Sequence, residues 1–149
     1  MIVLLNQIEA FLNNQPELVV RRIDESILQV QSEKASSPRF IDLSFETEPR
    51  IGISMVVDYF PNATSLDTAW KFLDLLSSPI ERKEYFKGKA RYKVDYRVIK
   101  ETGFKELFGT GMTWLYPFWK KDTTHVVTEK EFISRANALK EFKSLKSNF

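Results

Sequence analysis

The sequence predicts an α+β protein with a single antiparallel sheet of about six to seven strands and three helices, one N-terminal, one in the middle and one C-terminal. Apolar residues recur at helical spacing in three segments, and short runs of alternating apolar and polar residues lie between them. Because short turns join most of these runs, we expect the strands to pair antiparallel.

Spacing and end signals locate the first two helices. Apolar residues recur at helical intervals over residues 2–14, and Pro16 bounds that segment. For the middle helix, the hydroxyl of Thr64 or Ser65 can accept a hydrogen bond from the first turn, and residues 77–79 (Ser-Ser-Pro) end it.

The last helix is predicted from a capping-box pattern, Thr128 followed three residues later by Glu131. We therefore expect it to begin at residue 128 or 129. Its predicted buried residues are Phe132, Ala136 and Leu139, which follow at helical spacing.

Seven segments are predicted as strands, and residues 90–99 alternate most regularly among them, with Tyr92, Val94 and Tyr96 facing the core. Residues 33–38 are predicted as a polar loop and residues 103–108 as one or two helical turns. The predicted strands are 18–23, 27–31, 39–46, 51–59, 90–99, 112–119 and 123–127.

Length and composition predict one domain over residues 1–149, since a chain of this length buries a sizeable core. The stretch 77–84 is the only tolerable boundary, and we reject it because each half would have a thin core. The first residues lack the basic start of a signal peptide, and no apolar run reaches the roughly 18 residues of a membrane span. We therefore expect a cytoplasmic protein with no membrane partner.

The charge divides between the two halves of the chain. Residues 1–81 hold six basic and twelve acidic side chains, a charge of −6, whereas residues 82–149 hold sixteen basic and eight acidic side chains, a charge of +8. Fields of opposite sign steer the approach of charged partners. The division therefore favours a macromolecular partner.

Four acidic residues are the first candidates for partner binding, because predicted strands and their turn would present them in a fixed pattern to a basic protein. Asp42 and Glu46 lie on one face of the predicted strand 39–46. The wide spacing between these two carboxylates argues against a metal or acid–base site there. The four residues are Asp42, Glu46, Glu48 and Asp58.

A basic stretch with interleaved aromatic residues supports an alternative, a nucleic-acid-binding surface over residues 82–100. Basic side chains bind phosphates and aromatic rings stack on bases. The alternation, however, places Tyr92 and Tyr96 on the face opposite the basic side chains. The candidate residues are Lys87, Lys89, Arg91, Lys93 and Arg97.

The densest aromatic stretch is residues 114–119, with aromatic side chains on both faces of the predicted strand. Tyr116 and Trp119, where exposed, are candidate anchors of a protein interface. A further alternative is a small-ligand pocket bordered by Trp70, Tyr92 and Trp114.

Few signals of catalysis are present. The chain has no cysteine, and its one histidine, His125, excludes a two-histidine metal site within the chain. No Gly-x-Ser-x-Gly elbow and no phosphate-binding glycine pattern occur. We therefore expect no cofactor, although a carboxylate-based active site stays open as an alternative.

The favoured hypothesis is a non-enzymatic, inhibitor-like protein-binding module that acts through a charged sheet face on a basic partner such as a toxin domain. Bacterial toxin-immunity proteins are one class that performs such a task, and this assignment rests on analogy alone.

Overall fold

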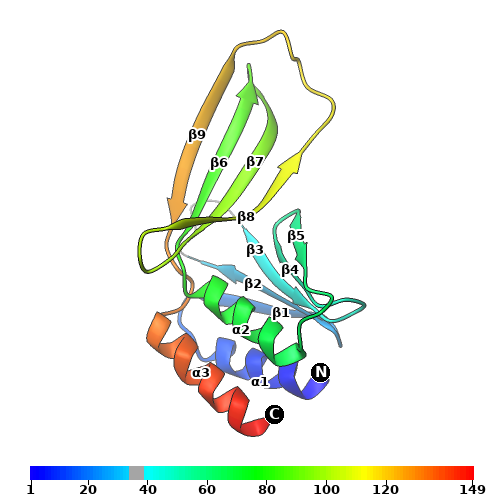
Figure 1. The fold of residues 1–149 in the computed structure, drawn as a ribbon, viewed down its shortest axis with the longest axis vertical. Coiled ribbons are helices and arrows are strands. Elements are labelled where there is room, and N and C mark those ends of the chain that lie inside the picture. Colours follow the sequence, from blue (N-terminus) through cyan, green and yellow to red (C-terminus); the bar gives the residue numbers. More distant parts are fainter. Residues whose placement is uncertain (34–38) are drawn as a thin grey trace. The chain divides into compact units, whose positions relative to one another are not determined.

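The computed structural model describes residues 1–33 and 39–149 and contains three helices and two antiparallel sheets. The α+β class is confirmed, and the helices lie at the N-terminus, in the middle and at the C-terminus. The single sheet of six to seven strands is wrong, because the nine strands in the described ranges form separate sheets of five and four strands (Figure 1). The predicted loop over 33–38 lies, from residue 34 on, outside the described residues.

The chain divides into two compact units. The first, here called the helical unit, comprises Met1–Ser77 with Glu131–Phe149, and the second, the strand unit, comprises Ser78–Lys130. The division falls within the stretch 77–84, the domain boundary that was weighed and rejected on the sequence. One domain over residues 1–149 stays a prediction.

The helical unit contains the five-stranded sheet, whose order β1-β2-β3-β4-β5 follows the chain, with every neighbouring pair antiparallel. Helix α1 contacts β1, α2 contacts β3, and α3 contacts both α1 and α2. The elements are α1 (Ile2–Asn13), β1 (Leu18–Asp24), β2 (Ile27–Ser32), β3 (Phe40–Ser44), β4 (Arg50–Ile53), β5 (Val56–Tyr59), α2 (Ser65–Leu76) and α3 (Arg135–Asn148).

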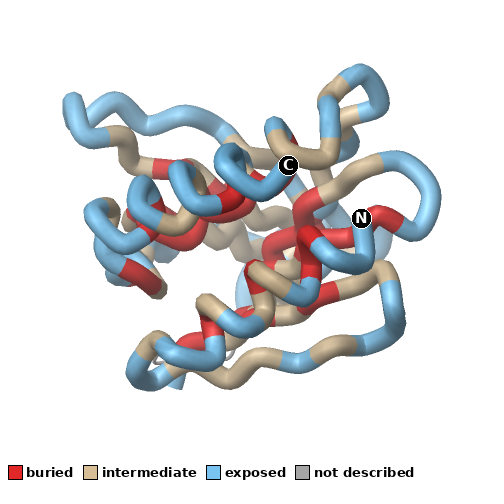
Figure 2. Tube along the Cα trace, turned by 90° about the horizontal axis from the view of Figure 1, so that it is seen from below, coloured by how far each residue is buried: buried red, intermediate tan, exposed pale blue. Residues whose placement is uncertain are grey.

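Two cross-strand rows form the sheet side of the core of this unit, because paired residues project from the same face. The rows are Leu28–Leu43–Ile51 and Val30–Ile41–Ile53, all buried. The helices bury one side each, so buried and exposed stretches alternate along them (Figure 2). Their buried residues include Leu5, Ile8, Leu12, Phe72, Leu73, Ala138 and Leu145.

The predicted strand 51–59 is interrupted by a tight turn at Ser54 and Met55, which separates β4 from β5. Ser54 has a φ of 54°, as the first position of a type II′ hairpin turn requires. The turn reverses the alternation, so Val56 pairs with Ile53 and is buried while Val57 is exposed. The expected common face over 51–59 is therefore wrong.

Helix α3 begins later than predicted. Thr128 belongs to a strand and pairs with Glu81, so its backbone is not at a helix end. Ser134 is the N-cap, and its hydroxyl accepts a hydrogen bond from the N–H of Asn137 at 3.2 Å. The buried positions shift accordingly to Ala138 and Leu145, whereas Leu139 is half exposed.

The strand unit contains the four-stranded sheet, of order β8-β7-β6-β9, and no helix (Figure 1). The predicted helical turns at 103–108 and the predicted strand 112–119 are both wrong, because β8 covers much of the first segment and a loop covers most of the second. Strand β9 contains the predicted strand 123–127 and pairs with β6. The elements are β6 (Ile80–Lys87), β7 (Ala90–Ile99), β8 (Lys105–Met112) and β9 (Asp122–Glu129).

Strand β7 is confirmed over the predicted residues, but its two faces differ less than expected. Tyr96 and Val98 are buried and Arg91 is exposed, as the alternation predicts. Asp95 is buried too, and Lys93 is half-buried like Tyr92 and Val94. The expected burial pattern therefore holds in part, because charged side chains of this sheet are covered by one another.

The observed cap of α3 predicts a specific loss of stability. Ser134→Ala removes the acceptor for the N–H of Asn137, so we expect the free energy of unfolding to fall by about 1 kcal/mol. Chemical denaturation monitored by circular dichroism measures this. The matched control is Thr128→Ala, for which we expect a smaller loss; a larger loss for Thr128→Ala would place the cap at the residue that the sequence pattern indicated.

Candidate functional site

The connection between β8 and β9 carries the most exposed apolar side chains of the strand unit. We call residues 113–121 the aromatic loop. Four large apolar residues in it, Trp114, Leu115, Phe118 and Trp119, are between 71% and 92% exposed. Soluble proteins rarely leave such residues contiguous and uncovered unless the surface binds something. The loop is therefore the main candidate functional site.

The base of the aromatic loop is attached to the sheet beneath it. The ring of Tyr116 stacks on that of Tyr92, with centroids 4.6 Å apart. The N–H of Thr113 donates to the carbonyl of Tyr92 at 2.9 Å, and the N–H of Gly88 donates to the carbonyl of Lys121 at 3.0 Å. The loop is thus anchored at both ends, while its other large apolar side chains are left exposed.

Gly88 is needed where the loop meets the turn between β6 and β7. Its φ of +60° lies in the left-handed region, and a Cβ there would come within 2.8 Å of the side chain of Lys120. The absence of a side chain at residue 88 therefore lets the loop approach this turn closely.

Two lysines of the aromatic loop and one in the neighbouring turn add positive charge. Lys89, Lys120 and Lys121 are exposed, and within the described ranges none of them lies within ion-pair distance of a carboxylate. The neighbouring pair differs: Lys87 bonds Asp122 at 2.7 Å, and this bond lowers the pKa of Asp122. The loop therefore combines exposed apolar side chains with uncompensated positive charge.

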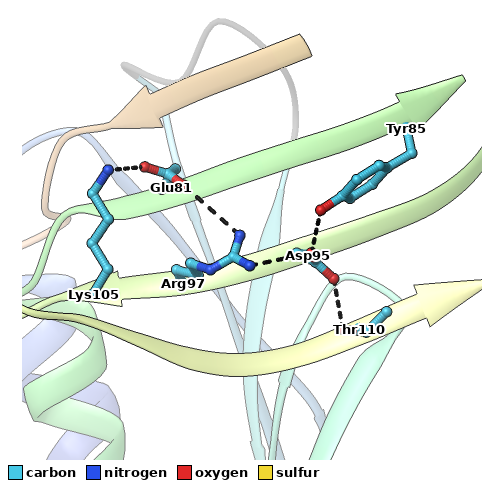
Figure 3. Close-up of polar contacts among 6 residues, drawn as sticks. All are labelled: Glu81, Tyr85, Asp95, Arg97, Lys105 and Thr110. Atoms are coloured by element: carbon cyan, nitrogen blue, oxygen red, sulfur yellow. Dashed lines mark hydrogen bonds and ion pairs between the residues drawn. The ribbon is translucent and has the colours of Figure 1, made fainter. Parts of the chain in front are cut away.

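One face of the strand unit holds a polar network around two buried carboxylates (Figure 3). Glu81 bonds Lys105 at 2.5 Å and lies 3.9 Å from Arg97. Asp95 lies 3.4 Å from Arg97 and accepts hydrogen bonds from the hydroxyls of Tyr85 at 2.8 Å and Thr110 at 2.6 Å. Each carboxylate therefore has several partners on neighbouring strands.

Asp95 in this network lacks the property of a general acid. Burial acts to raise the pKa of Asp95, but hydrogen bonds from Thr110 and Tyr85 and the charges of Lys93 and Arg97 outweigh it, so the pKa is lowered. A carboxylate with a lowered pKa stays ionised and is a poor proton donor near neutral pH. We interpret Asp95 as a structural anion.

The basic residues predicted for nucleic-acid binding are divided between the two faces and largely occupied. Arg97 belongs to the network of Glu81 and Asp95, while Lys93 lies over the ring of Tyr85 at 4.7 Å. On the other face, Arg91 bonds Glu84 at 2.7 Å. Lys87 is paired with Asp122, so of this set Lys89 alone has neither a carboxylate nor an aromatic ring as partner in the described part of the chain.

The acidic residues predicted for partner binding do not share one surface. Strand register places Asp42 in a row with Gly52 and Asp58 in a row with Ile51, on opposite faces of the sheet. Glu46 lies 3.7 Å from Arg50, and Glu48 is exposed in the same turn. The expected common pattern is therefore absent.

Asp42 itself is half-buried against Gly52. A Cβ on residue 52 would come within 2.6 Å of the carboxylate, so only glycine leaves room for it. Burial raises the pKa of Asp42, although the nearby positive charge of Arg50 acts to lower it. A carboxylate in this position offers little surface to a partner.

Two of the three aromatic residues proposed as pocket walls pack on other aromatic rings. Trp70 packs on Phe142, with centroids 4.8 Å apart, and Arg135 lies over its ring. Tyr92 carries Tyr116, and Trp114 is exposed. His125 is exposed on β9, 3.7 Å from Glu84. Trp70 lies in the helical unit and Tyr92 and Trp114 lie in the strand unit, and the ligand pocket stays a prediction.

Comparisons with protein-family models, curated proteins and solved structures find no match to this chain. Over the residues described, no helix is long and apolar enough to cross a membrane. In the same residues, no group of three or more histidine or acidic side chains is arranged to hold a metal ion.

The sequence indicated the stretch 114–119, with Tyr116 and Trp119 as anchors where exposed. Trp119 is exposed, whereas Tyr116 is half-buried on Tyr92. Trp114, Leu115 and Phe118 are exposed as well, and Lys120 and Lys121 follow them in the loop. Pro117, which is unfavourable for a strand interior, was the signal against a strand there.

The position of Asp42 predicts a pH-dependent effect. Because its pKa is raised from 3.8, its ionisation destabilises the folded state as the pH rises through the folded pKa. Asp42→Asn should therefore raise the free energy of unfolding at pH 7 relative to wild type, and the gain should disappear below pH 3.8. Urea denaturation at a series of pH values measures it.

Asp24→Asn is the control of opposite sign. Hydrogen bonds from Ser26 lower the pKa of Asp24, so its stabilising contribution is present above 3.8 and is lost as the pH falls through the folded pKa. This variant should be less stable than wild type at pH 7. If the free energy of unfolding changed with pH in the same way for both variants, Asp42 would not be a half-buried carboxylate.

Proposed function

We propose that this chain is a non-enzymatic protein-binding module that inserts its aromatic loop into an apolar pocket of a protein partner. The observation that carries the proposal is the exposure of Trp114, Leu115, Phe118 and Trp119 on a loop anchored at its base. Aromatic side chains that enter a pocket supply a large share of the binding energy of protein interfaces.

The anchoring supports binding because it reduces the entropy lost on association. A loop held by the Tyr92–Tyr116 stack and by backbone hydrogen bonds at both ends has fewer conformations to lose than a free segment. The inhibitor-like hypothesis fits such a surface, since occupying a pocket requires shape and exposed apolar area and no catalytic group. A toxin-immunity protein stays one such class by analogy.

The charge beside the loop favours an acidic rim on the partner pocket. Lys89, Lys120 and Lys121 are exposed and, within the described residues, unpaired. They would repel the basic partner expected from the sequence. We therefore infer a partner with carboxylates around an apolar pocket, and an association rate that falls as salt is added.

Nucleic-acid binding has less support. Among the basic side chains predicted for it, Arg91 and Arg97 are held by carboxylates of the same sheet and lie on opposite faces. A continuous phosphate-binding strip needs free basic groups on one face. The sheet offers no such strip in the described residues.

Photo-crosslinking in the source cell tests the proposal. A photoreactive phenylalanine analogue at Phe118 should capture one protein, because residue 118 lies in the contact surface. The matched control is the same analogue at Phe104, which is 65% exposed compared with 72% for Phe118, in the turn between β7 and β8. Capture of the same protein with equal yield at both positions would contradict a specific contact at the loop.

The captured protein is then used in binding measurements. Trp119→Ala should weaken its affinity by about 30-fold, the effect of losing an interface anchor worth ~2 kcal/mol. Phe104→Ala, at an exposed apolar residue in the turn between β7 and β8 of the same unit, should change the affinity by less than about threefold. Equal affinities for Trp119→Ala and wild type would overturn the proposal.

Vesicle flotation distinguishes a lipid surface from a protein. Exposed aromatics next to lysines also favour anionic membrane surfaces. Wild-type protein should not float with vesicles of phosphatidylcholine and phosphatidylserine. Flotation that Trp119→Ala abolishes would assign the loop to a lipid surface and overturn the proposal of a protein partner.

A further inference from the structure

Strand β9 is an edge strand without the usual protection against pairing. It ends the sheet order β8-β7-β6-β9, and it pairs with β6 over eight consecutive residues without a register shift. The sequence Asp-Thr-Thr-His-Val-Val-Thr-Glu contains no lysine, proline or glycine, and five of its residues are β-branched. Proteins normally protect a regular edge of this kind with charges, prolines or bulges.

The other edge strands of the described sheets differ from β9 in this respect. On the opposite edge of the same sheet, β8 contains two glycines and pairs with β7 through a register shift at Tyr96/Arg97. In the helical unit, β1 contains Arg21 and Arg22 and pairs with β2 through a register shift. Strand β5 is short, with four residues. These features discourage strand addition, so β9 is the edge that can accept it.

The charges at the two ends of β9 are complementary to a second copy of β9. In an antiparallel pair centred on Val126, each Asp122 lies opposite Lys130 of the other copy, and both residues are exposed. Charge complementarity therefore favours this register, in which the paired side chains also project from the same face.

In the same register, the side chains on one face of the two paired β9 strands are compatible with one another. Val126 pairs with Val126 of the second copy, and Thr124 pairs with Thr128 on each side of it. Cross-strand pairs of β-branched residues and threonines are favourable neighbours in antiparallel sheets. Val126 is 51% exposed in the single chain, so the pairing would cover apolar surface.

We propose that β9 pairs with β9 of a second copy, joining two four-stranded sheets into an eight-stranded sheet about a two-fold axis at Val126. The contact is isologous, so it closes as a dimer. The aromatic loop ends where β9 begins, so the loops of the two copies lie at opposite ends of the paired β9 strands. The dimer does not depend on the proposed function of the loop.

Analytical ultracentrifugation over a range of protein concentrations tests the dimer. Wild-type protein should shift with concentration from the monomer mass of 17.4 kDa to twice that mass. Val126→Lys places two lysines opposite each other at the axis and should weaken dimerisation by about tenfold or more. The matched control is Leu107→Lys on β8, where the replaced side chain is 54% exposed, and it should dimerise like wild type.

A charge-swap pair tests the register itself. Val126→Lys and Val126→Glu should each dimerise at least about tenfold more weakly than wild type, and their mixture should form a mixed dimer, since lysine then faces glutamate across the axis. Monomeric wild type at all concentrations, or a dimer that Val126→Lys leaves intact, would overturn the proposal.

Amide hydrogen exchange on the wild-type protein gives a readout that needs no variant. Exchange of β9 amides should slow as the protein concentration rises, because pairing occupies the outer N–H groups of the edge. Exchange in β8 should not change with concentration. Slowing in β8 with none in β9 would also overturn the proposal.

Discussion

Neutralisation of buried carboxylates across the strands is the interaction on which the strand unit depends. Glu81, Glu84 and Asp95 each meet basic side chains of the same sheet, and removing a partner would leave a poorly solvated charge. Burial of Tyr96, Val98 and Ile80 supplies apolar contacts, but no helix lies within residues 78–130. The sheet therefore combines a small apolar core with ion pairs and hydrogen bonds on both faces.

This neutralisation also determines which charges are available to a partner. Arg91, Arg97 and Lys105 are held by carboxylates, and Lys93 lies against an aromatic ring. The positive charge of the second half of the chain is consequently weaker as a binding surface than its composition indicates. Lys89, Lys120 and Lys121 have no such partners in the described residues.

The parts of the fold that sequence predicted are those in which local pattern and tertiary environment agree. Helices α1 and α2 and the β1–β2 hairpin have clear apolar periodicity and end signals. Strand β6 was missed because Glu81 and Lys83 alternate with Arg82 and Glu84, so neither face appears apolar. The late start of α3 has a similar cause, since pairing of Thr128 with β6 outweighs a good capping pattern.

The candidate site was predicted in part, and the reason lies in the turn geometry. Tyr116 and Trp119 were singled out by the density of aromatic residues around them, but alternation could not tell that Trp119 is exposed and Tyr116 half-buried, because no strand forms there. The acidic residues predicted for partner binding do not share one surface. The turn at Ser54 reverses the faces of the strand and so places Asp42 and Asp58 on opposite sides of the sheet. A single left-handed residue thus changes the outcome for a whole strand.

The central claim is that the aromatic loop makes the contact with a protein partner. The three tryptophans allow a direct test by fluorine NMR of protein labelled with 5-fluorotryptophan, because Trp114 and Trp119 lie in the loop and Trp70 packs on Phe142 in the helical unit. On titration with the captured partner, the resonances of Trp114 and Trp119 should shift or broaden while that of Trp70 stays unchanged. A change confined to Trp70 would contradict the claim.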